Sequence, residues 1–181
     1  RHTLTFSNIV LSLMKKRFFH IIVFLSALSA YSQEDNLITY YEKSDFKATP
    51  SYDETVAYCK LLDETSEMIH YTTFGKSPQG RDLPLLIIDR DGFTDPSSVN
   101  NAGKLVVLIQ AGIHPGEIDG KDAGFMFFRD LVILKKLGQI PENLTFLFIP
   151  VINVDGHERF GPYNRINQDG PEQMGWRTTA R

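Results

Sequence analysis

Two apolar runs on either side of an amphipathic segment constrain the fold of this chain more than any other feature. The runs are KLVVLIQAG at residues 104–112 and LTFLFIPVIN at residues 144–153, and both are rich in the β-branched and aromatic residues that favour strands. Between them, residues 119–137 carry apolar side chains at helical spacing. A strand, a helix and a second strand in this order form a crossover between parallel strands. We therefore expect an α/β fold with a mixed, partly parallel sheet flanked by helices.

Two further segments extend this prediction. Ser51 and Glu54 have the spacing of a capping box and open a helical pattern that continues to about Ile69. After a turn rich in Gly, Pro and Ser, the run LPLLIID at residues 83–89 predicts a short buried strand. The run at 104–112 is apolar throughout, which is typical of a central strand covered on both faces.

Composition narrows the class of protein. The chain has 181 residues, of which 42% are hydrophobic and 23% are charged, as in an ordinary globular domain. Its net charge of -3 and the lack of a basic cluster beyond residue 17 exclude a nucleic-acid-binding protein. The single cysteine, Cys59, lies in the first helical pattern, and we interpret it as a small buried apolar residue.

The N-terminal residues predict export. Residues 14–32 contain a basic cluster, an apolar run and small residues in that order, which is the pattern of a signal peptide. A membrane anchor is the alternative, but the apolar run is shorter than the roughly 20 residues that a spanning helix needs. Residues 1–13 are interpreted as an upstream artefact and residues 33–50 as a linker or arm. Residues 51–181 are expected to be a domain cut at its C-terminus, located in the periplasm or outside the cell.

Polar residues gather after the two predicted parallel strands. His114 and Glu117 follow the first strand, and the loop after the second strand contains Asp155, His157, Arg165 and Arg177. Sites in α/β sheets form where such loops meet beyond the carboxyl ends of the strands. We expect the two loops to face one crevice.

His114 and Glu117 have a spacing that suits zinc. Pro115 and Gly116 between them supply a tight turn, and catalytic zinc commonly takes two His and one Glu. On spacing alone, a loop histidine beside a glutamate that begins a helix is an equally good interpretation. A third ligand is not evident: His2 and His20 lie outside the predicted domain, His70 precedes the predicted first strand, and His157 follows an Asx-type turn.

Four stretches in order are similar to one known family. They are GKSPQGRDLPLLII at 75–88, GIHPGE at 112–117, PVINVDGHERF at 150–160 and GWR at 175–177. Together they resemble the N-terminal half of the catalytic domain of zinc carboxypeptidases of the A/B type. The resemblance covers roughly residues 50–181 and implies a carboxypeptidase-like fold.

The resemblance also implies roles for individual residues. It makes His114 and Glu117 ligands of one Zn²⁺ ion and Arg177 the residue that stabilises the oxyanion, with Arg165 as the competing arginine. The third ligand and the general-base glutamate of the family belong beyond Arg181. Gly116 stands where members often have an arginine, which puts one substrate contact in doubt. Val154 replaces a proline in a family element that is mainly a structural turn beside the site.

The implied function is that of an exported zinc metallocarboxypeptidase acting on peptide or protein substrates. This chain alone is expected to bind zinc weakly and to hydrolyse nothing. Two alternatives remain open, a deacylase of N-acyl amino acids and a non-catalytic binding module of the same fold. No stable membrane anchor is expected after cleavage of the signal peptide, and the sequence does not predict the oligomeric state.

Overall fold

The computed structural model describes residues 35–164 and 170–178. The chain divides into two compact units, Arg1–Ile38 and Thr39–Arg181. The predicted artefact at 1–13, the predicted signal peptide at 14–32 and Arg165 lie outside the described residues. None of the helices among the described residues combines the length and the apolar character that crossing a membrane requires.

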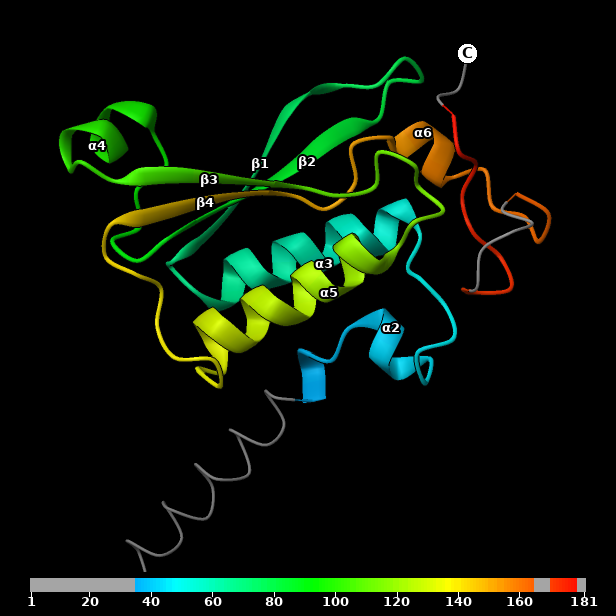
Figure 1. Cartoon of the computed structure of the whole chain (residues 1–181), viewed down its shortest axis with the longest axis horizontal. Helices are drawn as coiled ribbons and strands as arrows, with labels where there is room; N and C mark the ends of the chain where they lie inside the picture. Colours follow the sequence, from blue (N-terminus) through cyan, green and yellow to red (C-terminus); the bar gives the residue numbers. More distant parts are fainter. Residues whose placement is uncertain (1–34, 165–169, 179–181) are drawn as a thin grey trace, which may run out of the picture. The chain divides into compact units, whose positions relative to one another are not determined.

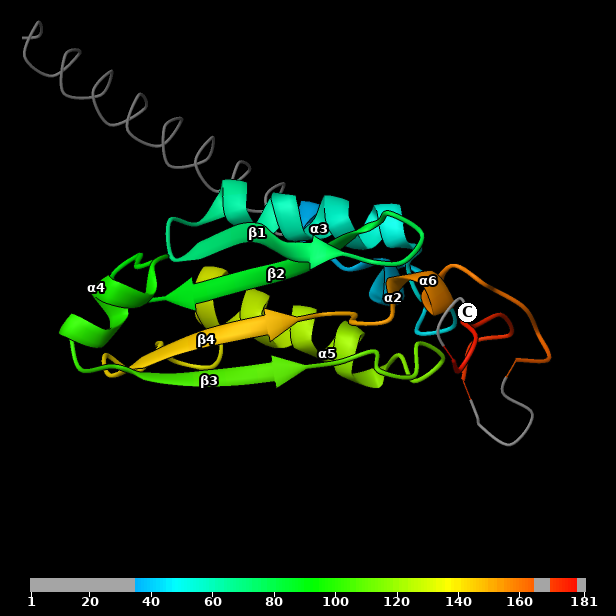
Figure 2. The same cartoon turned by 90° about the horizontal axis from the view of Figure 1, so that it is seen from above.

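The second unit contains a mixed sheet with two long helical segments against one face (Figures 1 and 2). Its elements, in chain order, are α2 (Tyr40–Lys43), α3 (Tyr52–Thr65), β1 (Ile69–Lys76), β2 (Asp82–Asp89), α4 (Pro96–Asn101), β3 (Leu105–Gln110), α5 (Asp119–Phe128), the π-helix η1 (Arg129–Ile133), β4 (Leu144–Ile149) and α6 (Val154–His157).

The strand order among the described residues is β1-β2-β4-β3. β1 pairs with β2 and β2 with β4 in antiparallel fashion, whereas β3 and β4 are parallel. The connection from β3 through α5 to β4 is therefore the predicted crossover, and the predicted α/β fold with a mixed, partly parallel sheet is confirmed.

Helix α3 begins as predicted. The Ser51 hydroxyl accepts a hydrogen bond from Glu54 N, and the Glu54 carboxylate accepts one from Ser51 N, which completes the capping box. The helix ends at Thr65, because Ser66 adopts an extended conformation. The predicted end near Ile69 is wrong: residues 69–76 form β1, and His70 lies within this strand rather than before the first one. The β-branched and aromatic residues of this stretch favour a strand.

The core lies between the sheet and helices α3 and α5. Phe125 and Phe128 on α5 contact Phe148 on β4, with ring centroids 5.7 and 5.2 Å apart. Cys59 and Leu62 on α3 are fully buried, so the interpretation of Cys59 as a core residue is confirmed. Burial raises the pKa of its thiol, and a neutral thiol is a poor nucleophile.

Two predictions about the crossover need correction. The helical stretch ends at Ile133 rather than Leu137, because Lys135 has a left-handed φ of 55° that no α-helix can continue. Strand β3 is not a central strand covered on both faces. It is an edge strand of the described sheet, and Leu105, Val106 and Leu108 are 63%, 54% and 57% exposed. An apolar run indicates that both faces of a strand can be buried, but it does not show that they are buried in this chain.

Candidate metal centre

The stretch that carries His114 and Glu117 is a turn directly after β3. Glu117 N donates a hydrogen bond of 2.8 Å to His114 O, which closes the turn. Both side chains project to the same side, so that His114 Nδ1 lies 3.2 Å from each carboxylate oxygen of Glu117. The two side chains are partly exposed, at 37% and 47%. The structure thus brings together the two residues that the spacing singled out.

The turn is fastened to the chain that leaves β4. Ile152 N donates to Ala111 O and Asn153 N donates to Gly112 O, each at 3.1 Å. Gly112 has a φ of +62°, and a Cβ atom there would lie 2.8 Å from Cγ2 of Val151. Glycine is required at this position for both reasons. The loops after β3 and β4 therefore lie side by side, as the strand-end argument predicted.

The distance between the ligand atoms of His114 and Glu117 is suitable for two of the ligands of a zinc ion. Two ligand atoms that each lie about 2.1 Å from a tetrahedral zinc ion are about 3.4 Å apart. The separation of 3.2 Å between His114 Nδ1 and the Glu117 oxygens is close to that value. Among residues 35–164 and 170–178, no group of three or more His, Cys, Asp and Glu side chains is placed to hold a metal ion. The pair is therefore an incomplete ligand set within the described chain.

The other described histidines do not supply the third ligand. His157 is 1% exposed, and its two ring nitrogens contact Lys121 Nζ and a Glu158 oxygen at 2.8 and 2.9 Å. His70 lies on β1 with Nδ1 3.8 Å from Asp63.

The Asn-Val-Asp-Gly stretch after β4 is a helix start as well as a turn. The Asn153 side chain accepts a hydrogen bond of 3.0 Å from Gly156 N and so caps the short helix α6. Asp155 is buried and accepts hydrogen bonds from Ser77 Oγ, Arg81 Nη1 and Gln79 N, at 2.8, 2.8 and 3.1 Å. It therefore clamps the turn between β1 and β2 to α6.

The electrostatics of Asp155 follow from these contacts. Burial alone would raise the pKa of the carboxyl group, but the hydrogen bonds from Ser77, Arg81 and Gln79 outweigh it and hold the pKa below its ordinary value. Asp155 remains ionised at neutral pH. The groups that donate hydrogen bonds to Asp155 all hold parts of the fold together, which indicates that Asp155 has a structural role.

Arg177 is exposed, and it forms no ion pair with any described residue. Its segment is held in place by neighbours: Trp176 N donates a hydrogen bond of 2.7 Å to Gly156 O, and Met174 pairs with Gly161. Figures 1 and 2 both place this segment, α6 and the loop after β3 at the same end of the sheet. Arg177 therefore belongs to the end of the molecule that carries His114 and Glu117.

Sequence reasoning missed the buried contact between Lys121 and His157 beneath this end of the sheet. A lysine in the first turn of an amphipathic helix is normally placed on the solvent face. No pattern in the sequence marks Lys121 as buried.

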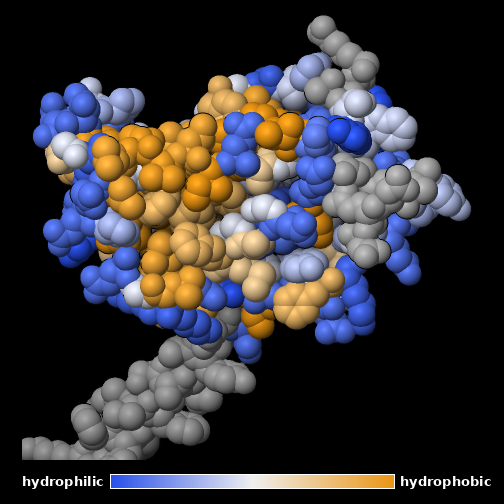
Figure 3. Space-filling view, in the orientation of Figure 1, coloured by the Kyte–Doolittle hydropathy of each residue, from blue (hydrophilic) through white to orange (hydrophobic). Residues whose placement is uncertain are grey.

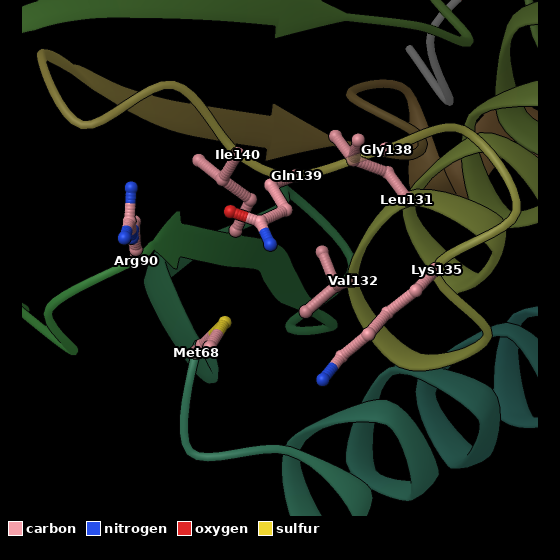
Figure 4. A pocket seen from close by; sticks show the side chains of 8 residues that line it. All are labelled: Met68, Arg90, Leu131, Val132, Lys135, Gly138, Gln139 and Ile140. Atoms are coloured by element: carbon pink, nitrogen blue, oxygen red, sulfur yellow. The ribbon is translucent and has the colours of Figure 1, made fainter.

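A separate cavity of about 170 Å³ lies at the opposite end of the sheet (Figure 4). Its lining includes Met68 before β1, Arg90 after β2 and Ile140 before β4. None of the predicted site residues, His114, Glu117 and Arg177, lines it.

The model of one protein family, described as zinc carboxypeptidase, matches residues 55–179. The chain belongs to the zinc carboxypeptidase family. Comparison with curated proteins gave no match. The resemblance drawn from the four sequence stretches is thus confirmed at the level of the family.

The carboxypeptidase fold is supported by the first of two similar solved structures. Carboxypeptidase A from Helicoverpa armigera has a TM-score of 0.56 and 21% identity, and the match covers 93% of this chain and 42% of that one. A metallo-carboxypeptidase from Burkholderia cenocepacia has a TM-score of 0.48 and 22% identity, over 59% of this chain and 28% of that one. The chain thus spans less than half the length of these solved carboxypeptidases.

Proposed function

We propose that this zinc carboxypeptidase chain is part of an exported metallocarboxypeptidase that hydrolyses C-terminal peptide bonds. The observation that carries the proposal is the turn that sets His114 Nδ1 3.2 Å from both oxygens of Glu117 beyond the carboxyl end of β3. Membership of the family supports the reaction class. The pattern of residues 14–32 supports export.

In this proposal His114 and Glu117 hold the metal ion. Zinc in such sites polarises a carbonyl group and activates water. The ring nitrogen that faces Glu117 is Nδ1, and it must be unprotonated to act as a ligand. Arg177, which is exposed at the same end of the sheet, can direct its guanidinium N–H groups at an oxyanion.

Zinc binding by the chain tests this proposal directly. The wild-type chain is titrated with Zn²⁺ against a chromophoric chelator and compared with H114A and E117Q. We expect measurable but weak binding, since two protein ligands leave the coordination incomplete, and we expect each variant to abolish it. H70A is the matched control, because His70 is a partly exposed histidine on β1, away from the pair.

Two results would contradict the proposal. One is zinc binding that H114A and E117Q leave unchanged, and the other is a loss of binding in H70A equal to that in H114A. Peptide hydrolysis by this chain alone is expected to be absent, which an assay of C-terminal residue release at saturating zinc would check. Zinc-dependent release would show that the set of catalytic groups in this chain is complete.

A further inference from the structure

Two buried side chains and one partly exposed carboxylate form a cluster near the start of α5, which follows the candidate metal centre in the chain. Lys121 on α5 is 1% exposed, and its Nζ atom lies 3.0 Å from Pro50 O and 2.8 Å from His157 Nε2. His157 Nδ1 in turn lies 2.9 Å from Glu158 Oε1. The same oxygen accepts a hydrogen bond of 2.7 Å from Tyr52 N, in the first turn of α3. We call Lys121, His157 and Glu158 the Lys121 cluster.

The environment fixes which atoms donate in the Lys121 cluster. Burial lowers the pKa of Lys121 to about 8. Burial, together with the neighbouring Lys121 charge, lowers the pKa of His157 to about 4. At neutral pH the lysine is therefore charged and the histidine is neutral. Lys121 donates to His157 Nε2, and His157 donates through Nδ1 to the carboxylate of Glu158.

The Lys121 cluster connects the two parts of the candidate site, which are the His114–Glu117 pair and the segment that carries Arg177. Lys121 lies one helical turn after Glu117, at the start of α5. His157 is the last residue of α6. Residues 174–177, which we call the Arg177 segment, pack on this helix through Trp176 N and Gly175. A Cβ atom on Gly175 would lie 2.9 Å from the Cα atom of His157, so the two backbones touch.

Stability alone does not explain a buried lysine at this position. Removing an ammonium group from water is costly, and apolar replacements of buried charged groups are often at least as stable. An ammonium with directed partners differs from an apolar side chain because it permits one arrangement of the surrounding backbone. Here those partners are the Pro50 carbonyl and the His157 ring.

We propose that Lys121 is a positioning residue. Through His157 and Glu158 it locks α5, which begins behind the His114–Glu117 pair, to α6, on which the Arg177 segment docks. The part that concerns zinc rests on the proposed function, whereas the part that concerns the Arg177 segment does not.

The test uses K121M, which keeps an unbranched side chain one heavy atom shorter than lysine and removes its donors. Trp176 is the single tryptophan of the chain and donates to Gly156 of α6, so its fluorescence reports on the Arg177 segment. At a temperature where circular dichroism shows the fold intact, we expect acrylamide quenching of Trp176 to increase. We also expect zinc affinity to fall by roughly ten-fold, the usual scale for residues that orient metal ligands.

K104M is the matched control. The side chain of Lys104 is likewise buried, at 3% exposure, and pairs with Asp89 at 2.7 Å, but Lys104 precedes β3 at the opposite end from the candidate site. The K104M variant should be less stable than the wild-type chain, but its Trp176 quenching and zinc affinity should be unchanged. Equal effects of K104M and K121M, or no effect of K121M on quenching, would overturn the proposal. If the wild-type chain binds no zinc, the proposed function fails and the quenching result alone decides the role of Lys121.

A second pair of variants covers the case in which K121M does not fold. H157Q keeps an acceptor for Lys121 and a donor for Glu158, whereas H157L keeps neither. We expect H157Q to show wild-type quenching and H157L to show increased quenching. Identical behaviour of these two variants would show that the contacts of the cluster do not position the Arg177 segment.

Discussion

Asp155 shows how one buried carboxylate holds two distant parts of the chain together. Its oxygens accept hydrogen bonds from Ser77, Arg81 and Gln79 at the β1–β2 turn, although Asp155 itself lies on α6. Because its pKa is lower in the folded chain than in the unfolded chain, it stabilises the fold above the unfolded pKa. That contribution is lost as the pH falls through the folded pKa.

The substitution D155N should lower the free energy of unfolding by about 2–3 kcal/mol at pH 7, since a charged hydrogen-bonded pair is broken and Arg81 stays partly buried. It should also flatten the fall in stability below pH 4. Urea denaturation at pH 7 and at pH 3 measures both effects. D82N is the control, because Asp82 pairs with Lys76 at the surface, where such pairs contribute at most about 1 kcal/mol. A loss in D82N as large as that in D155N would contradict this account.

For contacts between individual residues, the sequence predicts those within a turn better than those across the fold. The proximity of His114 and Glu117 follows from their spacing and from Pro115-Gly116, because a turn closed by an i to i+3 hydrogen bond brings its ends together. The contact between Lys121 and His157 joins positions 36 residues apart. It depends on how α5 and α6 pack, which no local pattern specifies.

Among the elements, helix α3 has the clearest local cause. Its capping box satisfies two backbone N–H groups at the first turn, and replacement of a capping serine by alanine typically costs about 1 kcal/mol. We therefore expect S51A to lose about that amount of unfolding free energy, measured by urea denaturation. E64A, an exposed position on the same helix, should change it by less. Equal stabilities of the two variants would show that the cap is not stabilising.

The sequence analysis missed helix α4 and strand β1 for different reasons, and α4 was missed because it lacks an apolar period. Helix α4 begins with Asp95 as its cap and Pro96 in its first turn, yet only Val99 is buried among its residues. Strand β1 was missed because its first residue, Ile69, continues the apolar spacing of the preceding helix in the sequence. In the structure the helix has already ended before Ile69, since Ser66 is extended. The parallel β3–β4 pair was predictable because both runs are long and apolar and a helix separates them.

In the molecule as a whole, the second face of the sheet differs from the face that α3 and α5 cover. A groove of about 390 Å³ lies on it, with a lining that includes Leu85, Ile87, Val106 and Leu147. Apolar residues are prominent on the face of the molecule seen in Figure 3, and Val106 and Leu108 of the edge strand β3 are more than half exposed. Exposed apolar edge strands promote association between chains.

The chain is therefore expected to self-associate and to bind a hydrophobic dye such as ANS. The double substitution V106K/L108K should reduce both effects, because charged side chains on an edge strand oppose pairing. Size-exclusion chromatography with light scattering and ANS fluorescence are the measurements. K60E, an exposed charge change on α3, serves as the control. A wild-type chain that is monomeric at high concentration and binds no dye would contradict the prediction.

The burial of Cys59 has a practical consequence for following motion in this molecule. The chain has one thiol, and it is fully enclosed in the core with a raised pKa. Maleimide and nitroxide reagents need an accessible thiolate, so they will leave the wild-type chain unlabelled. Two cysteines introduced at an exposed position on β3 and beside Arg177 would then be the reactive groups. Distances between two such labels could be measured without first removing a native cysteine.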